Sequence, residues 1–347
     1  MLLAAGCGGG SGSGSGGPAG DAPTIALFLP ESKTTRYEAF DRPLFEAKVK
    51  ALCANCKLLY NNADQDAAKQ QQQVEAALAQ GADVLVLDAV DASAAASLVN
   101  QARQKRVPVI AYDRLISGIS YEYYVSFNNV RVGEVQGQAL LDALNARGTA
   151  DKGKIVMING APTDPSSADY KSGAHKVLDG KVQIGREFDT PDWSPDKAQQ
   201  QMEQAITALG RDNIVGVLSA NDGMAGGAIA AMKRAGYTTL PPITGQDAEL
   251  AAVQRILTGE QYMTVYLDIR SEAEKSAELA VALTKGEQPP ATTKVDNGGA
   301  EIPAFLLDPI AVTADKVKDT IVKDGFYQPG QICTGAVAAA CGKAGIQ

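Results

Sequence analysis

The sequence predicts an α/β protein of two lobes, each built on a doubly wound parallel sheet. Short apolar runs alternate with amphipathic helical patterns along the chain, as expected for strand–helix–strand units that form parallel sheets. The chain has 347 residues, more than one hydrophobic core usually organises. The same alternation starts again after residue 127, so we expect two such lobes.

The first half opens on TIALFLP at 24–30, a nearly continuous apolar run typical of a strand buried on both faces. Gly81 follows the second helical pattern, where glycine is a favoured C-cap. The predicted strands are 24–30, 57–61, 83–88, 108–113 and 123–127, and the predicted helices are 37–52, 67–80 and 92–106.

The second half repeats this order and ends in a tail that two cysteines bracket. Its predicted helices are 132–146, 172–178, 194–209, 224–235, 249–257, 271–285 and 314–324. Its predicted strands are 154–159, 183–188, 214–219, 242–245, 263–266 and 304–307. Ligands of open α/β sheets bind beyond the carboxyl ends of the strands, so the residues just past each strand are the place to look for a site.

Charge and composition exclude several classes of function. The net charge of -8 repels phosphate backbones, which argues against a nucleic-acid partner. The single histidine, His175, argues against histidine metal sites and most histidine-based catalysis. The chain contains neither a GxxxxGK[ST] phosphate loop nor a G-x-S-x-G elbow. We therefore expect no metal, no cofactor and no catalytic residue.

The N-terminus reads MLLAAGC and continues as a Gly/Ser tract. Small residues before a cysteine resemble the end of a lipoprotein signal peptide, and the tract would be a flexible tether, so we expect Cys7 to carry lipid. The n-region and most of the h-region are missing, so we expect a truncated start or a misassigned start codon. A disordered start with a chance cysteine is the alternative.

The other four cysteines form two local pairs, Cys53 with Cys56 and Cys333 with Cys341. An exported protein meets an oxidising environment, which favours two structural disulfides. Free thiols are the alternative. A redox motif or half a zinc site fits less well. Cys53 ends a helical pattern and Cys56 begins a strand, whereas a reactive thiol usually opens a helix, and no histidine lies near either pair.

Polar and aromatic side chains recur at the predicted strand ends of both halves. Carboxylates and amides accept from sugar hydroxyls, arginine donates to them, and aromatic rings stack on the C–H faces of a sugar. Taken singly, Asp222 is as typical of a helix N-cap as of a ligand contact. The strand-end residues are Glu31, Lys33, Arg36, Tyr37, Asp113, Arg114, Asn128, Asn129, Asp164, Ser166, Ser167, Tyr170, Trp193, Asn221, Asp222, Gln246 and Asp247.

These residues carry a family resemblance. The chain resembles the type I periplasmic sugar-binding proteins of ABC importers, in particular their D-xylose-binding branch, from about residue 24 to 326. The matching stretches are RY (36–37), VIAYDR (109–114), VSFNNVRVGE (125–134), SANDGMAGG (219–227), GQDA (245–248), MTVY (263–266) and VKDGF (322–326).

The resemblance implies which residues bind the ligand. Arg36, Asp113, Arg114, Asn129, Asp222 and Gln246 match positions that bind sugar hydroxyls in such proteins, and Trp193 matches a stacking tryptophan. We add the neighbouring Tyr37 and Asn221, and expect Asp113→Ala and Asp222→Ala each to abolish binding. Two positions depart from the family pattern: Leu267 replaces a lysine, and Pro165-Ser166 replaces Asn-Asn. The expected ligand is thus a xylose-like aldose that need not be xylose.

The resemblance also implies two Rossmann-like lobes with a hinge, which close around the sugar. We place a lipoprotein signal remnant and Gly/Ser tether at 1–21, the N-terminal lobe at 22–128 plus 247–298, the C-terminal lobe at 129–246 plus 299–330, and a tail with the second cysteine pair at 331–347. The expected partners are a monosaccharide and ABC permease subunits, and the protein is expected to be monomeric, extracytoplasmic and attached to the membrane only through lipid. A sugar receptor for a sensor kinase or chemoreceptor stays open as an alternative, and a sugar-acting α/β enzyme is less favoured.

Overall fold

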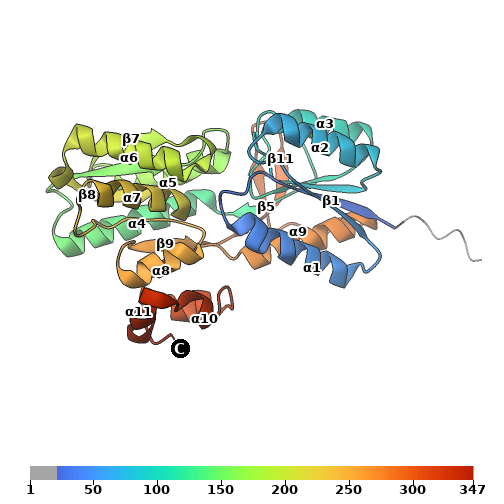
Figure 1. Cartoon of the computed structure of the whole chain (residues 1–347). Coiled ribbons are helices and arrows are strands. Elements are labelled where there is room, and N and C mark those ends of the chain that lie inside the picture. Colours follow the sequence, from blue (N-terminus) through green and yellow to red (C-terminus); the bar gives the residue numbers. More distant parts are fainter. Residues whose placement is uncertain (1–21, 347) are drawn as a thin grey trace, which may run out of the picture.

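The computed structural model describes residues 22–346, which form two α/β lobes side by side (Figure 1). The first lobe has a seven-stranded sheet in the order β10-β11-β5-β4-β3-β1-β2. All neighbouring strands are parallel except the antiparallel pair β10 and β11. The strands are β1 Thr24–Leu29, β2 Lys57–Asn62, β3 Val84–Leu87, β4 Val109–Tyr112, β5 Tyr123–Phe127, β10 Thr293–Asp296 and β11 Glu301–Leu307.

Helices cover both faces of this sheet, as the buried apolar strands require. One face packs on α1 Arg42–Leu52 and α9 Ile269–Thr284, and the other on α2 Ala67–Ala79 and α3 Ala95–Gln104 (Figure 1). A π-helical segment, Tyr37–Asp41, leads into α1. Every residue of β1 is buried, which confirms the prediction of a strand covered on both faces.

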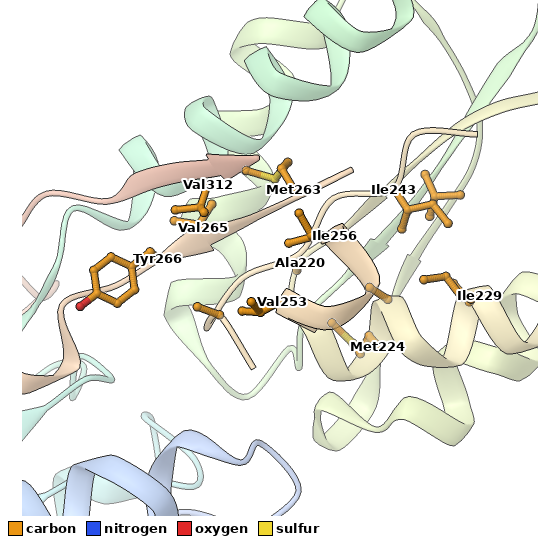
Figure 2. Packing of buried hydrophobic residues seen from close by; sticks show 14 of the residues in the cluster. Ala220, Met224, Ile229, Ile243, Val253, Ile256, Met263, Val265, Tyr266 and Val312 are labelled. Carbon is orange, nitrogen blue, oxygen red and sulfur yellow. The ribbon is translucent and has the colours of Figure 1, made fainter. Parts of the chain in front are cut away.

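The second lobe is built on the parallel strands β7-β6-β8, which isolated bridges extend to the antiparallel pair β9 and β12. Its largest apolar cluster joins Met224 of α7, Val253 of α8 and Val265 of β9 (Figure 2). The strands are β6 Lys154–Asn159, β7 Gln183–Asp189, β8 Ile214–Ser219, β9 Met263–Tyr266 and β12 Ile310–Thr313. The helices are α4 Asn129–Arg147, α5 Pro165–Leu178, α6 Pro195–Leu209, α7 Asp222–Arg234 and α8 Leu250–Thr258.

The chain crosses between the lobes near residues 128, 267 and 308, which corrects the predicted lobe boundaries. Residues 247–266 were expected in the first lobe, but β9 pairs with β12 and α8 packs beside α7 in the second. Conversely, β11 was expected in the second lobe and instead lies beside β5 in the first. Strand pairing between distant segments decides both cases, and no local pattern reports it.

Several element boundaries also differ from the sequence prediction. Helix α5 begins at Pro165, seven residues earlier than expected, because Asp164 caps it and proline is favoured in a first turn. The predicted strand 242–245 is reduced to isolated bridges at Ile243 and Gln246. Strands β10 and β12 were not predicted, and the predicted helix 314–324 is mostly turns around a π-helical segment, Lys318–Val322.

Both predicted cysteine pairs are disulfide-bonded in the structure. Cys53–Cys56 joins the end of α1 to the start of β2. Cys333–Cys341 joins the short helices α10 Pro329–Ile332 and α11 Ala338–Lys343, which lie against the second lobe below α8 (Figure 1). Cys7 lies outside the described residues. Within 22–346, no helix combines the length and the apolar character that crossing a membrane requires.

Candidate functional site

A polar cavity lies between the two lobes, where the carboxyl ends of their strands face each other. About 320 Å³ of unfilled space lies between its walls, part of it open to solvent. Both lobes supply its walls, so a small ligand inside it would touch both. The first lobe contributes Thr34, Arg36, Tyr37, Asp113 and Arg114, and the second contributes Asp164, Tyr170, Trp193, Asn221, Gln246 and Asp247.

Arg36 is held in a fixed orientation by carboxylates behind it. Its Nε donates to Asp41 at 3.0 Å, and its Nη2 donates to Asp41 at 2.6 Å and to Glu272 of α9 at 2.5 Å. Burial alone would lower the pKa of the guanidinium, but the surrounding carboxylates, Asp113 among them, outweigh it and raise the pKa. Arg36 therefore stays charged, and it is oriented before any ligand arrives.

Asp113 comes directly after β4 and turns into the cavity. Its Oδ1 lies 3.5 Å from Arg36 Nη1, and its Oδ2 accepts a hydrogen bond of 3.0 Å from the hydroxyl of Tyr37. Its φ of 59° lies in the left-handed region, where aspartate and asparagine are tolerated better than most residues. Ser126 and Tyr124 donate to its main-chain carbonyl and hold this conformation.

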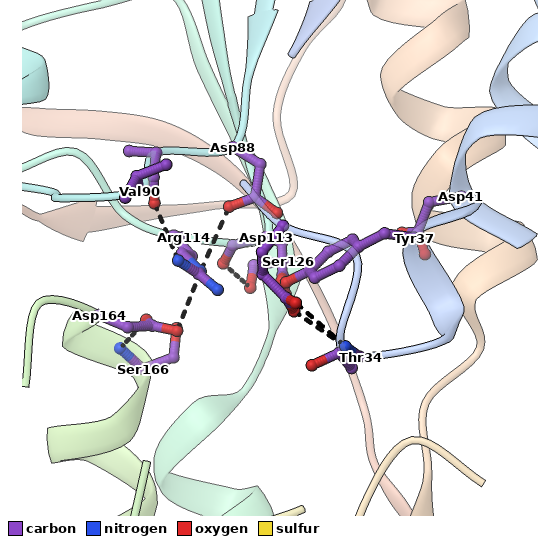
Figure 3. A network of polar contacts seen from close by, with 12 residues as sticks. Thr34, Tyr37, Asp41, Asp88, Val90, Asp113, Arg114, Ser126, Asp164 and Ser166 are labelled. Atoms are coloured by element: carbon purple, nitrogen blue, oxygen red, sulfur yellow. Dashed lines mark hydrogen bonds and ion pairs between the residues drawn. The ribbon is translucent and has the colours of Figure 1, made fainter. Parts of the chain in front are cut away.

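Arg114 bridges the lobes from a fully buried position. Its Nε lies 3.4 Å from Asp88 in its own lobe and 3.1 Å from Asp164 in the other (Figure 3). Its Nη1 donates to the carbonyl of Ala89 at 3.2 Å. Burial raises the pKa values of Asp88 and Asp164, and the charge of Arg114 opposes that rise. This arginine therefore joins the two halves of the cavity wall.

Trp193 forms the aromatic wall of the cavity. Its ring packs against Gly160, where an added Cβ would lie 2.0 Å from the indole Cη2. Tyr170 meets it edge-on, with ring centroids 6.3 Å apart. The indole nitrogen is buried and has no hydrogen-bond partner among residues 22–346, so it offers a donor to a ligand.

The remaining wall consists of amide and carboxylate groups of the second lobe. Asn221 caps α7 through its Oδ1, which accepts from Met224 N at 2.9 Å and leaves its amide nitrogen as a donor. Gln246 Oε1 is buried without a partner in the described part of the chain. Burial raises the pKa of Asp247 to about 7; Arg36 opposes the shift, whereas Glu249 adds to it.

The structure brings seven of the nine predicted ligand residues to the cavity: Arg36, Tyr37, Asp113, Arg114, Trp193, Asn221 and Gln246. Asn129 lies behind the wall, where its amide donates to Ser166 Oγ at 3.1 Å. Asp222 is fully buried and hydrogen-bonded inside the second lobe. Contrary to the sequence prediction, it does not reach the cavity. Asp222 is the first residue of α7 and points into the lobe, whereas the preceding residue, Asn221, is the N-cap of the helix and lines the cavity.

Four cavity residues were not among the predicted ligand residues: Thr34, Asp164, Tyr170 and Asp247. Asp164, Tyr170 and Asp247 stand in the strand-end positions of the sequence, and that signal could have selected them. Thr34 carried no signal of its own. Leu267, which replaces the family's lysine, is buried in the apolar cluster of the second lobe and does not line the cavity.

This set of groups suits a neutral, hydroxyl-rich molecule. Fixed guanidinium donors alternate with carboxylate and amide acceptors, and one aromatic face lies beside them. Residues 22–346 contain no group of three or more histidine, cysteine or acidic side chains placed to hold a metal ion.

Comparison with known proteins finds relatives of this chain among the periplasmic binding proteins. The family model described as periplasmic binding protein domain matches residues 25–288. The D-xylose-binding periplasmic protein of Haemophilus influenzae is 35% identical over 87% of this chain and 90% of its own length. Its namesake from Escherichia coli K12 is 34% identical over 89% and 92%.

A solved structure agrees with this placement. An ABC transporter solute-binding protein from Clostridium phytofermentans, with bound β-D-glucose, superimposes with a TM-score of 0.82. It is 28% identical and covers 89% of this chain and 99% of its own. The two α/β lobes with a polar cavity between them, together with these relatives, identify a solute-binding protein. The chain belongs to the periplasmic binding protein family and, within it, to the type I sugar-binding proteins of the xylose branch.

Proposed function

We propose that this protein captures a single aldose in the interlobe cavity outside the cytoplasm and delivers it to the permease of an ABC importer. The observation that carries the proposal is the convergence of Arg36, Asp113 and Asp247, from the two lobes, on a cavity that Trp193 also lines. A monosaccharide offers adjacent hydroxyls to the polar groups and a C–H face to Trp193.

Unpartnered buried atoms support a ligand that both donates and accepts hydrogen bonds. Trp193 Nε1 needs an acceptor and Gln246 Oε1 needs a donor, and burying either without a partner costs about 1–3 kcal/mol. A sugar hydroxyl serves either atom. Both arginines already face carboxylates, so the cavity keeps little positive charge for an anionic sugar.

The test of this proposal is a calorimetric screen of aldopentoses and aldohexoses, with gluconate and glucose 6-phosphate as charged controls. We expect one or two neutral aldoses to bind and both anions to fail. The two relatives from Haemophilus influenzae and Escherichia coli are D-xylose-binding proteins and the solved relative holds glucose, so these two sugars head the screen. Failure of every neutral aldose would overturn the proposal. Co-purification with permease subunits, as opposed to a sensor kinase, tests the proposed output.

Hinge closure is the proposed mechanism of capture. Contacts across the cleft support it: the Arg114–Asp164 ion pair of 3.1 Å, and a main-chain hydrogen bond of 3.3 Å from Ala92 N to Thr163 O. Phe40 of the first lobe also stacks on Phe326 of the second, with ring centroids 4.0 Å apart. A ligand that touches both lobes favours the closed population. Small-angle scattering should show a smaller radius of gyration when sugar is added.

Affinity is expected to rise with pH through neutrality. Asp247, with its pKa at about 7, is mostly a carboxylic acid at pH 6 and mostly a carboxylate at pH 8. If a sugar hydroxyl donates to it, only the carboxylate binds fully, so affinity should increase about tenfold over that interval. Titration calorimetry at both pH values measures the change, and Asp247→Asn should flatten it. Equal affinities of the unmodified protein at both pH values would contradict the role given to Asp247.

Attachment to the membrane through lipid on Cys7 is also a proposal. The short apolar start and the Gly/Ser tract behind Cys7 support it. When the gene is expressed behind a complete lipoprotein signal, the protein should partition into Triton X-114 detergent, and Cys7→Ser should move it to the aqueous phase. Cys333→Ser is the control, because it removes a cysteine without touching the proposed anchor. Aqueous partitioning of the unmodified protein would exclude the anchor.

A further inference from the structure

Asp222 lies behind the cavity wall and joins three segments of the second lobe. Its Oδ1 accepts from Gln261 Nε2 at 2.7 Å, and its Oδ2 accepts from Thr264 Oγ1 at 2.8 Å and from Glu249 N at 3.0 Å. Its own amide donates to the carbonyl of Gln246 at 3.0 Å. We call Asp222, Gln261 and Thr264, with the backbone of 245–249, the Asp222 network.

The segment that this network holds has an unfavourable backbone. Asp247 has a φ of 90° and Ala248 a φ of 48°, conformations that non-glycine residues adopt only when their surroundings enforce them. Thr264 supplies part of that enforcement, because its hydroxyl accepts from Ala248 N at 3.1 Å while it donates to Asp222. The conformation in turn aims Gln246 and Asp247 at the cavity.

Gly245 lies directly against the buried carboxylate of Asp222. A Cβ at this position would lie 1.9 Å from Asp222 Oδ1 and 2.5 Å from Gln261 Nε2. The absence of a side chain at 245 therefore lets the carboxylate approach the turn closely enough to bind its backbone. Three parts of the sequence that are far apart, Asp222, Gly245 and Thr264, thus meet at a single point.

We propose that Asp222 and Thr264 are positioning residues for ligand binding: they fix the strained turn 245–248 so that Gln246 and Asp247 face the sugar, without touching the sugar themselves. The inference rests on the proposed function, since it deepens the account of the same cavity. It replaces the direct contact with sugar that the sequence indicated for Asp222.

Thr264 offers a matched pair of substitutions. Thr264→Val keeps the shape and loses the hydroxyl, whereas Thr264→Ser keeps the hydroxyl. With D-xylose and D-glucose as probes, we expect Thr264→Val to weaken binding about tenfold or more and Thr264→Ser to stay within about threefold of the unmodified protein. Asp222→Asn should weaken binding as much as Thr264→Val does. Both carboxylate oxygens of Asp222 accept hydrogen bonds, so the NH2 group of asparagine would face one of the donors Gln261 Nε2, Thr264 Oγ1 or Glu249 N and lose that bond. Equal effects of the Val and Ser variants would overturn the inference.

A double-mutant cycle separates positioning from general weakening. Asp247→Asn should reduce the affinity for sugar clearly less in the Thr264→Val background than in the unmodified protein, by about threefold or more. In that background the Asp247 carboxylate no longer points at the sugar, so its removal changes less. Asp113→Asn, in the opposite lobe, should cost the same in both backgrounds. Additive effects for Asp247 would contradict the proposal.

Amide hydrogen exchange tests the same inference without any ligand. In Thr264→Val, the amides of 244–250 should exchange about tenfold faster or more, whereas Thr264→Ser should leave them unchanged. If no aldose binds the unmodified protein, the proposed function fails, and the exchange data still decide whether the network holds the turn. Unchanged exchange in the Val variant would refute the network's role, whatever the protein binds.

Discussion

Replacing Asp113 by alanine is expected to abolish detectable sugar binding while the protein stays folded. Asp113 is the acceptor of the Tyr37 hydroxyl and the cavity-side partner of Arg36. One hydrogen bond to a charged group contributes about 1.5–3 kcal/mol, and two such bonds to a sugar would amount to at least ~3 kcal/mol, or more than 100-fold in affinity. Arg36 keeps Asp41 and Glu272, so the fold should survive.

The measurement is titration calorimetry with the best aldose of the screen, beside a thermal unfolding curve. Asp113→Asn is the matched variant, because asparagine tolerates the φ of 59° and removes only the charge. It should fall between the alanine variant and the unmodified protein. Asp151→Ala, on an exposed turn of the second lobe, is the control and should bind normally. If Asp113→Ala binds as tightly as the control, the cavity is not the sugar site.

Replacing Gly160 by alanine is expected to remove the aromatic wall. The added Cβ would meet three atoms of the Trp193 ring at 2.0–2.4 Å, so the indole must move away. A stacked sugar face buries about 100 Å² of apolar surface, which contributes about 2.5 kcal/mol at ~25 cal/mol per Å². We therefore expect affinity to fall about 60-fold.

Fluorescence reports this change directly, because Trp193 is the only tryptophan of the chain. Its emission should shift in Gly160→Ala, and the response to sugar should disappear. Gly223→Ala is the matched control, since the nearest atom to its added Cβ lies at an ordinary 3.5 Å. If Gly160→Ala proves unstable, Trp193→Ala tests the same wall. Normal affinity in a folded Gly160→Ala variant with a displaced indole would show that stacking contributes nothing.

Local patterns predicted most of the fold. Strands 123–127, 154–159, 214–219 and 263–266 were placed to the residue, because each is a short apolar run between clear helix and turn signals. The pattern was weaker where tertiary contacts decide the outcome. Strand β12 pairs only with β9, and segment 242–246 forms isolated bridges at Ile243 and Gln246 in place of a strand.

The chemical character of the candidate site could be predicted from the sequence, but not every residue that lines it. The position after each strand selected Asp113, Arg114 and Trp193, which all line the cavity, because chain direction alone brings parallel strand ends to one edge of a sheet. The same rule could not separate Asn221 from Asp222. They are adjacent in sequence, yet the first turn of α7 sends one to the cavity and the other to the lobe interior.

The sequence by itself determined the fold class through hydrophobic periodicity and the sugar-binding chemistry of the strand ends through residue types at local positions. It indicated the family through the resemblance of its motifs to those of known proteins. Only the tertiary structure decided which segments belong to which lobe and which polar side chains meet in the cavity. Those outcomes depend on contacts between residues far apart in the chain, such as Arg114 with Asp164 and Gly245 with Asp222. Their energies come from close packing and burial, which exist only once the chain has folded.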